Sequence, residues 1–280
     1  MLYLDNGASP QMVARAQPQV RLSVKLCLTV WLMGAQAIRT ITALPEVFAF
    51  LQVAQTCADI GEAVQELTIS LLPSALADAA SRNTFVPTIR NALRRTPNLT
   101  DLTLLLPKTT PAAIFFQISF PHLKLFKTNL PHSVIRQFLT QNNSISDLVV
   151  GPCNSRGQCP LQDVDLEHMT TLECHAGCLS ALAHPGLVHL AVENHDPSCH
   201  MSVALCKLPV VMRNLYSLTL DVISDDTNIL FSVSLVAPRV RKLKLLEKRR
   251  LVSGIAIVSL HPAHSDPTGS PQSGLLASRV

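Results

Sequence analysis

A short phrase recurs seven times between Pro97 and Leu245. One copy reads P-N-L-T-D-L-T-L over 97–104. Each copy begins with a turn residue, which is followed by an aliphatic residue and two mostly polar residues. A second apolar residue, one further residue and usually another aliphatic residue complete it. A repeat of about 20–29 residues is one supersecondary unit, which buries its apolar face only by stacking on its neighbours. The steps here are 18 to 28 residues, measured between the first apolar residues Leu99, Leu123, Ile145, Met169, Leu187, Leu215 and Val240.

Expected helices precede several of these phrases. Residues 45–61 carry Pro and Glu in a first helical turn and apolar residues at helical spacing, while 86–95 and 132–140 follow or contain a proline near their start. Aliphatic residues alternate within each phrase, which is typical of a strand with one buried face. A strand and a return segment repeated in one direction form a parallel sheet. We therefore expect an α/β solenoid whose curved parallel sheet has a concave open face and carries helices or irregular segments on its convex side.

The repeats divide the chain into three parts. We expect an irregular N-terminal segment over 1–44, the solenoid over 45–260, and a disordered tail over 261–280, which is rich in Pro, Ser and Gly. The loop 151–160 is another break in composition and is expected to project from the solenoid. The apolar run 26–37 admits two interpretations, a targeting signal or anchor, and a buried helix or strand where the repeats begin.

Composition and motifs argue against several classes of function. The net charge is only +4 and the basic residues are mostly scattered, so no nucleic-acid partner is expected. With 10 glycines and no glycine-rich phosphate loop, the chain is expected to bind no cofactor. The run 26–37 is too short to span a membrane, and no membrane partner is expected.

The sequence also lacks the motifs of nucleophilic and metal-dependent hydrolases. It has no G-x-S-x-G elbow, no H-E-x-x-H and no cysteine-protease signature. His189 lies on the expected open face, but spacing identifies no acid or nucleophile beside it. We therefore expect a protein that is not an enzyme and has no catalytic residues.

The eight cysteines allow two interpretations. Structural zinc sites usually bring two ligands two to four residues apart in each of two pairs, and only Cys174 and Cys178 have that spacing. Cys174 also falls on a core-facing position of its phrase. We therefore expect no metal site, and reduced thiols that act as small buried apolar groups. The residues considered as ligands are Cys153, Cys159, Cys174, His175, Cys178, Cys199, His200 and Cys206.

The polar positions of the phrases are predicted to face outward and to bind a partner. Acidic groups concentrate toward the start of this set and basic groups toward its end, so the face can orient a partner through complementary charge. The alternative is that these positions are only solvated. They are Asp101, Thr103, Lys127, Asp147, Thr171, Glu173, His189, Ser217, Thr219, Lys242 and Lys244.

The phrase L-x-x-L-x-L at steps near 24 residues, with helices such as I-R-N-A-L-R-R (89–95) before it, resembles the leucine-rich-repeat proteins. More narrowly, it is similar to the degenerate repeats of fungal F-box proteins, in which a helix precedes a strand like V-Q-E-L-T-I (64–69). That resemblance implies a substrate receptor of an SCF-type ubiquitin ligase, whose F-box binds the cullin-ligase adaptor while the repeats bind substrate. Leu44-Pro45-Glu46-Val47 is similar to the family's L-P-x-E opening, but the helical module that should follow it is not evident.

We therefore expect an intracellular protein-interaction scaffold, in the cytoplasm or nucleus, with an unknown protein partner on the concave face. A cullin-ligase adaptor is a second expected partner if an F-box exists. The alternative is a secreted or surface repeat protein, in which disulfides between Cys153 and Cys159 or Cys199 and Cys206 become feasible. In that setting the sequons that begin at Asn98 and Asn142 would accept glycans.

Overall fold

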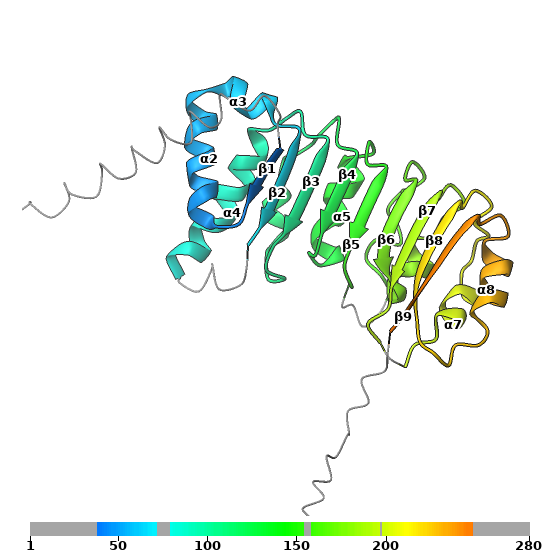
Figure 1. The fold of residues 1–280 in the computed structure, drawn as a ribbon. Helices are drawn as coiled ribbons and strands as arrows, with labels where there is room; N and C mark the ends of the chain where they lie inside the picture. Colours follow the sequence, from blue (N-terminus) through cyan, green and yellow to red (C-terminus); the bar gives the residue numbers. More distant parts are fainter. Residues whose placement is uncertain (1–37, 72–78, 154–157, 197, 249–280) are drawn as a thin grey trace, which may run out of the picture. The chain divides into compact units, whose positions relative to one another are not determined.

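The computed structural model describes residues 38–71, 79–153, 158–196 and 198–248, which form a single parallel sheet with helices (Figure 1). The order of the strands in the sheet is their order in the sequence, and every neighbouring pair is parallel. This is the architecture of a leucine-rich-repeat solenoid, an α/β fold. The strands are β1 (Ile38–Ile41), β2 (Glu66–Ser70), β3 (Asp101–Leu105), β4 (Leu125–Thr128), β5 (Asp147–Val150), β6 (Thr171–His175), β7 (His189–Glu193), β8 (Ser217–Val222) and β9 (Lys242–Glu247).

The return segments contain most of the helices, and Figure 1 shows the longer ones together on one side of the sheet. Neighbouring return segments pack on one another: α2 contacts α4, and α7 contacts α8. The helices are α2 (Leu44–Thr56), α3 (Ala58–Ala63), α4 (Ala79–Arg94), α5 (His132–Gln141), α6 (Leu179–Leu182), α7 (Met201–Cys206) and α8 (Ile229–Val236), with the 3-10 helices η2 (Ala112–Phe115) and η3 (Ala176–Cys178).

The core lies between the sheet and these helices. Alternate strand residues, such as Leu102 and Leu104 of β3, are fully buried on the helix side. The residues between them point to the other side, which we call the open face, and most of them are half-buried. This two-residue alternation is the one that the repeated phrase predicts. None of the helices in the described part of the chain has the length and apolar content needed to cross a bilayer.

The middle of the core is aromatic. The ring of Phe138 in α5 lies 4.4 Å from that of Phe115 in η2 and 4.8 Å from that of Phe126 in β4, measured between ring centroids. Phe120 completes the group, with its ring 6.1 Å from that of Phe138. Offset and edge-on ring pairs of this kind stabilise a core beyond the area that they bury. One layer of an otherwise aliphatic core is therefore built around rings.

The boundaries differ from the expectation in several places. The sheet starts at Ile38, inside the segment 1–44 that was expected to be irregular, and the expected helix 45–61 is divided into α2 and α3 by the extended backbone of Cys57. Helix α4 starts at Ala79, before the expected 86. The apolar run 26–37 and the tail 261–280 lie outside the described residues.

Candidate functional site

The open face holds every residue that the phrases predict to face outward. Lys127, His189, Lys242 and Lys244 are exposed, and the others are half-buried. The parallel register arranges them in two rows across the sheet. The first row contains Asp101, Asp147, Thr171, His189, Ser217 and Lys242, and the second contains Thr103, Lys127, Glu173, Thr219 and Lys244.

The rows carry the predicted change of charge from acidic to basic. Glu66 of β2 extends the first row on its acidic side, because it pairs in register with Asp101. The carboxylates of Asp101 and Asp147 each accept a hydrogen bond of 2.6 Å from the hydroxyl of the preceding residue, Thr100 or Ser146. These bonds hold two acidic groups in equivalent positions two strands apart. Lys127 of β4 interrupts the acidic half.

An aromatic side chain that the sequence prediction missed adjoins the basic half of the open face. Tyr216 directly precedes β8 and is 37% exposed. The amine of Lys242 lies 5.3 Å from the centre of its ring, and the ring of His189 meets it edge-on at 6.2 Å. An exposed tyrosine held between cationic or polar neighbours is the kind of anchor that dominates many protein interfaces.

A second polar group lies at the carboxyl ends of β6 to β9. The rings of His175 and His195 are 5.4 Å apart, and Nε2 of His195 lies 3.4 Å from a carboxylate oxygen of Glu193. Burial, followed by the charge of His195, lowers the pKa of His175. The amine of Lys248 is 2.5 Å from the buried carboxylate of Asp221, which also accepts the Asn194 backbone N–H. These contacts join the ends of β7, β8 and β9.

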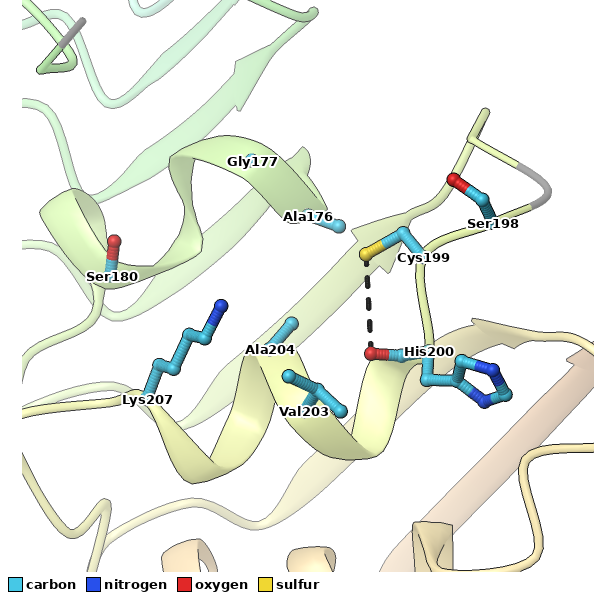
Figure 2. Close-up of a pocket in the computed structure, with 9 residues that line it drawn as sticks. All are labelled: Ala176, Gly177, Ser180, Ser198, Cys199, His200, Val203, Ala204 and Lys207. Carbon is cyan, nitrogen blue, oxygen red and sulfur yellow. Dashed lines mark hydrogen bonds between the residues drawn. The ribbon is translucent and has the colours of Figure 1, made fainter.

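A hollow of about 400 Å³ lies on the segments that follow β6 and β7. Figure 2 shows that small side chains such as Ala176 and Ala204 line it, with the amine of Lys207 beside them. The thiol of Cys199 faces the backbone oxygen of His200 at 3.9 Å, and the imidazole of His200 turns away from the other lining residues (Figure 2). Burial raises the pKa of the Cys199 thiol. The polar groups of the hollow therefore do not converge on a common point.

The structure gathers three of the cysteines considered as metal ligands. The ligand atoms of Cys153, Cys159 and Cys178 lie within 4.8 Å of one another and of a nitrogen of His132, a residue that the sequence argument did not include. We call these four residues the Cys3His cluster. The loop 151–160 was expected to project, but Cys159 is buried and Cys153 is half-buried, because both turn back toward α5 and η3.

Hydrogen bonds orient the Cys3His cluster. Nδ1 of His132 lies 3.1 Å from the sulfur of Cys159, and Nε2 of the same ring lies 2.9 Å from the backbone oxygen of Gly151. A hydrogen bond with the Cys178 side chain lowers the pKa of the Cys159 thiol. Burial opposes this shift, and the contact with His132 adds to it. The same contact with Cys159, together with burial, raises the pKa of Cys178. The contact between the two sulfurs therefore shifts the pKa values of the two thiols in opposite directions, down for Cys159 and up for Cys178.

The other candidate ligands are separate. Cys174 is buried on the helix side of β6, as its place in the phrase predicts, and burial raises its pKa. His175 lies on the open face, Cys199 and His200 line the hollow, and the Cys206 sulfur is 3.3 Å from the Ser232 hydroxyl. Among the described cysteines, Cys57, Cys153, Cys159, Cys174, Cys178, Cys199 and Cys206 are all free thiols.

Comparison with known proteins gives a similarity of fold. No protein-family model matches the chain, and no curated protein matches it. Among solved structures, it is similar to the leucine-rich repeat-containing protein LegL7 from Legionella pneumophila, with a TM-score of 0.46 and 17% identity over 72% of this chain and 70% of that one. The assignment of this chain to the leucine-rich-repeat fold therefore rests on its own strand order and repeated phrase.

Proposed function

We propose that this protein is a non-enzymatic interaction scaffold that binds a protein partner on the open face of its sheet. The observation that carries the proposal is the pair of register-aligned rows of solvent-accessible polar side chains, with the helices on the other side. Repeat proteins of this kind use the extended surface of the sheet for binding. Tyr216, flanked by Lys242 and His189, supplies an anchor within reach of the basic half.

The charge distribution supports a partner with a complementary gradient. Glu66, Asp101, Asp147 and Glu173 lie on β2 to β6, whereas Lys242 and Lys244 lie on the last strand. Complementary charge steers a partner and fixes its orientation more than it raises affinity. A partner that presents a basic segment to the first strands and an acidic segment to the last one fits this face.

The finer form of the proposal is that the repeats recognise the substrate of an SCF-type ubiquitin ligase inside the cell. Its support is the similarity of the repeats to those of fungal F-box proteins. Leu44 and Val47 of the L-P-x-E-like segment are buried in α2, which lies between β1 and β2 and packs on α4. This segment is therefore part of the return segment between β1 and β2.

Site-specific photocrosslinking tests the binding face. A photoreactive amino acid replaces Thr219 on the open face in one variant and Gln137, an exposed residue of α5 on the helix side, in the matched control. We expect crosslinks to one protein partner from Thr219 and none from Gln137. Equal crosslinking from both positions, or crosslinking from Gln137 alone, contradicts the proposal.

Two further measurements separate the finer claims. Affinity capture that recovers the scaffold's partner but no cullin-ligase adaptor removes the ligase role and leaves the scaffold. Counting thiols in protein from its native source tests the location, because eight free thiols exclude a disulfide-bonded secreted form.

In the folded chain the sequon at Asn142 does not favour secretion, since its amide is buried and donates to the backbone oxygen of Phe138.

A further inference from the structure

The fold brings the Cys3His cluster together from three consecutive repeats. Lys127, Val149 and Glu173 stand in register on β4, β5 and β6. His132 follows the first of them by five residues, Cys153 follows the second by four, and Cys178 follows the third by five. Because the carboxyl ends of parallel strands lie at one edge of a sheet, these offsets deliver the three side chains to one place. Cys159 reaches the same place from the return segment after β5.

The imidazole of His132 is already oriented as a metal ligand would be. The backbone oxygen of Gly151 can only accept, so Nε2 carries a hydrogen, and the neutral ring that keeps this bond has its lone pair on Nδ1, the nitrogen that faces the sulfur of Cys159. Metal-binding histidines usually donate their second N–H to such a carbonyl, which fixes both tautomer and ring orientation. His132 is fully buried, and this bond leaves only the nitrogen that faces Cys159 for another function.

The ordinary role of a buried thiol is to act as a small apolar side chain. Cys174 fits that role, since it is buried in the hydrophobic core on the helix side of β6. The cluster does not fit it, because three sulfurs and a polar ring face one another where apolar contacts would stabilise the fold more simply. A shared ligand explains this arrangement, since buried polar groups in proteins have partners.

We propose that His132, Cys153, Cys159 and Cys178 bind one zinc ion in a closed structural site. Three cysteines and one histidine are a ligand set of structural zinc, and four protein ligands leave no position for a substrate. Zinc–ligand bonds of about 2.0–2.3 Å place tetrahedral ligand atoms roughly 3.7 Å apart. The four atoms here lie within 4.8 Å of one another, so side-chain shifts of about 1 Å complete the site.

The site explains how the segment between β5 and β6 is held. The described part of that segment contains no helix, whereas the segment between β4 and β5 contains α5 and the segment between β7 and β8 contains α7. A zinc ion there joins it to the start of α5 and to the end of η3, and thereby links three repeats. Since the site forms only in the folded chain, the free energy of zinc binding adds to the free energy of folding.

Elemental analysis and competition with a chelating dye test the proposal on the full-length protein. The wild type is compared with Cys153→Ser, which changes the half-buried ligand, and with Cys57→Ser, which changes an exposed thiol outside the cluster. We expect one zinc per chain in the wild type and in Cys57→Ser, and a zinc affinity more than about tenfold lower in Cys153→Ser. Cobalt added to the metal-free protein should give the absorption bands of a tetrahedral thiolate site, except in Cys153→Ser.

The wild type alone decides the question if Cys153→Ser does not fold. Zinc added to the metal-free wild type should protect Cys153, Cys159 and Cys178 from alkylation, while the exposed Cys57 and Cys206 react. Purified protein that takes up no stoichiometric zinc overturns the proposal. A disulfide among the three cluster cysteines overturns it as well, and so does iron as the metal in the native protein.

Discussion

Gly61 is buried in α3, where alanine would normally stabilise a helix by about 1 kcal/mol relative to glycine. At this position alanine is expected to destabilise the protein instead, because a Cβ atom at position 61 would overlap the backbone oxygen of Arg95, the residue that follows α4. We expect Gly61→Ala to lower the free energy of unfolding by about 1–3 kcal/mol, the usual cost of overpacking. Urea denaturation measures it. Gly151→Ala is the matched control, since its Cβ would lie 3.8 Å from the nearest atom and should leave stability nearly unchanged.

His184, also at the scale of single residues, makes stability depend on pH. Its Nδ1 accepts the Gly186 N–H, and its Nε2 is buried without a hydrogen-bond partner among the described residues. Burial lowers the pKa of His184 from 6.5, although the charges of Glu167 and Asp165 oppose this. The folded state therefore favours the neutral ring. Its contribution to stability is complete above the unfolded pKa and is lost as pH falls from 6.5 through the folded pKa.

The substitution His184→Asn tests this pH dependence, because the asparagine oxygen can replace Nδ1 as the acceptor for Gly186 while the side chain no longer titrates. The urea midpoint is measured from about pH 7.5 to about pH 5. We expect the midpoint of the variant to fall less over this range than that of the wild type. His168→Asn, at an exposed position, is the control and should follow the wild type. Identical profiles for wild type and His184→Asn would show that His184 does not contribute.

At the scale of elements, the side chains of a buried and a half-buried asparagine join neighbouring repeats. The side chain of Asn142, at the end of α5, accepts the Phe120 N–H at 2.6 Å and donates to the Phe138 oxygen at 2.7 Å. Asn129 similarly accepts the Leu106 N–H at 2.9 Å. Asn142→Ala leaves buried backbone groups without partners and should cost about 2–4 kcal/mol of unfolding free energy.

Thermal and urea unfolding of Asn142→Ala and Asn143→Ala check this prediction. Asn143 is the adjacent residue and is exposed, so its substitution controls for a general effect of losing an amide at this turn. We expect Asn143→Ala to stay within about 0.5 kcal/mol of the wild type. Equal losses for the two variants would contradict a bridging role for Asn142.

The same scale shows what the sequence could predict. The phrase alternates apolar and polar residues, so it predicts which strand residues face the helices and which face solvent, and Leu102 and Asp101 follow that prediction. It could not predict β1, because Ile38–Ile41 lacks the phrase. It also missed the Cys3His cluster, since ligand-spacing rules search within one segment. These ligands are distant in sequence and meet only through the strand register.

At the scale of the whole molecule, the repeats explain why the order of strands followed directly from the sequence. Each repeat contacts mainly its neighbours, so the position of a strand in the chain is also its position in the sheet. The partner-binding role of the open face depends instead on side chains that no packing requirement specifies. Tyr216 illustrates this, because nothing in the phrase distinguishes it from a solvated turn residue.

The last described strand gives the prediction that concerns the whole molecule. β9 pairs only with β8 among the described strands, and all six of its residues are exposed, including Leu243 and Leu245 at 38% and 37%. Such an edge invites pairing with a second chain, and lysines on an edge strand oppose it. Replacing both Lys242 and Lys244 with valine should therefore cause self-association through β9, whereas Lys207→Val, at an exposed position after α7, should not. Sedimentation velocity over a range of concentrations measures the outcome. If the double variant stays as monomeric as the wild type, these lysines do not protect the edge.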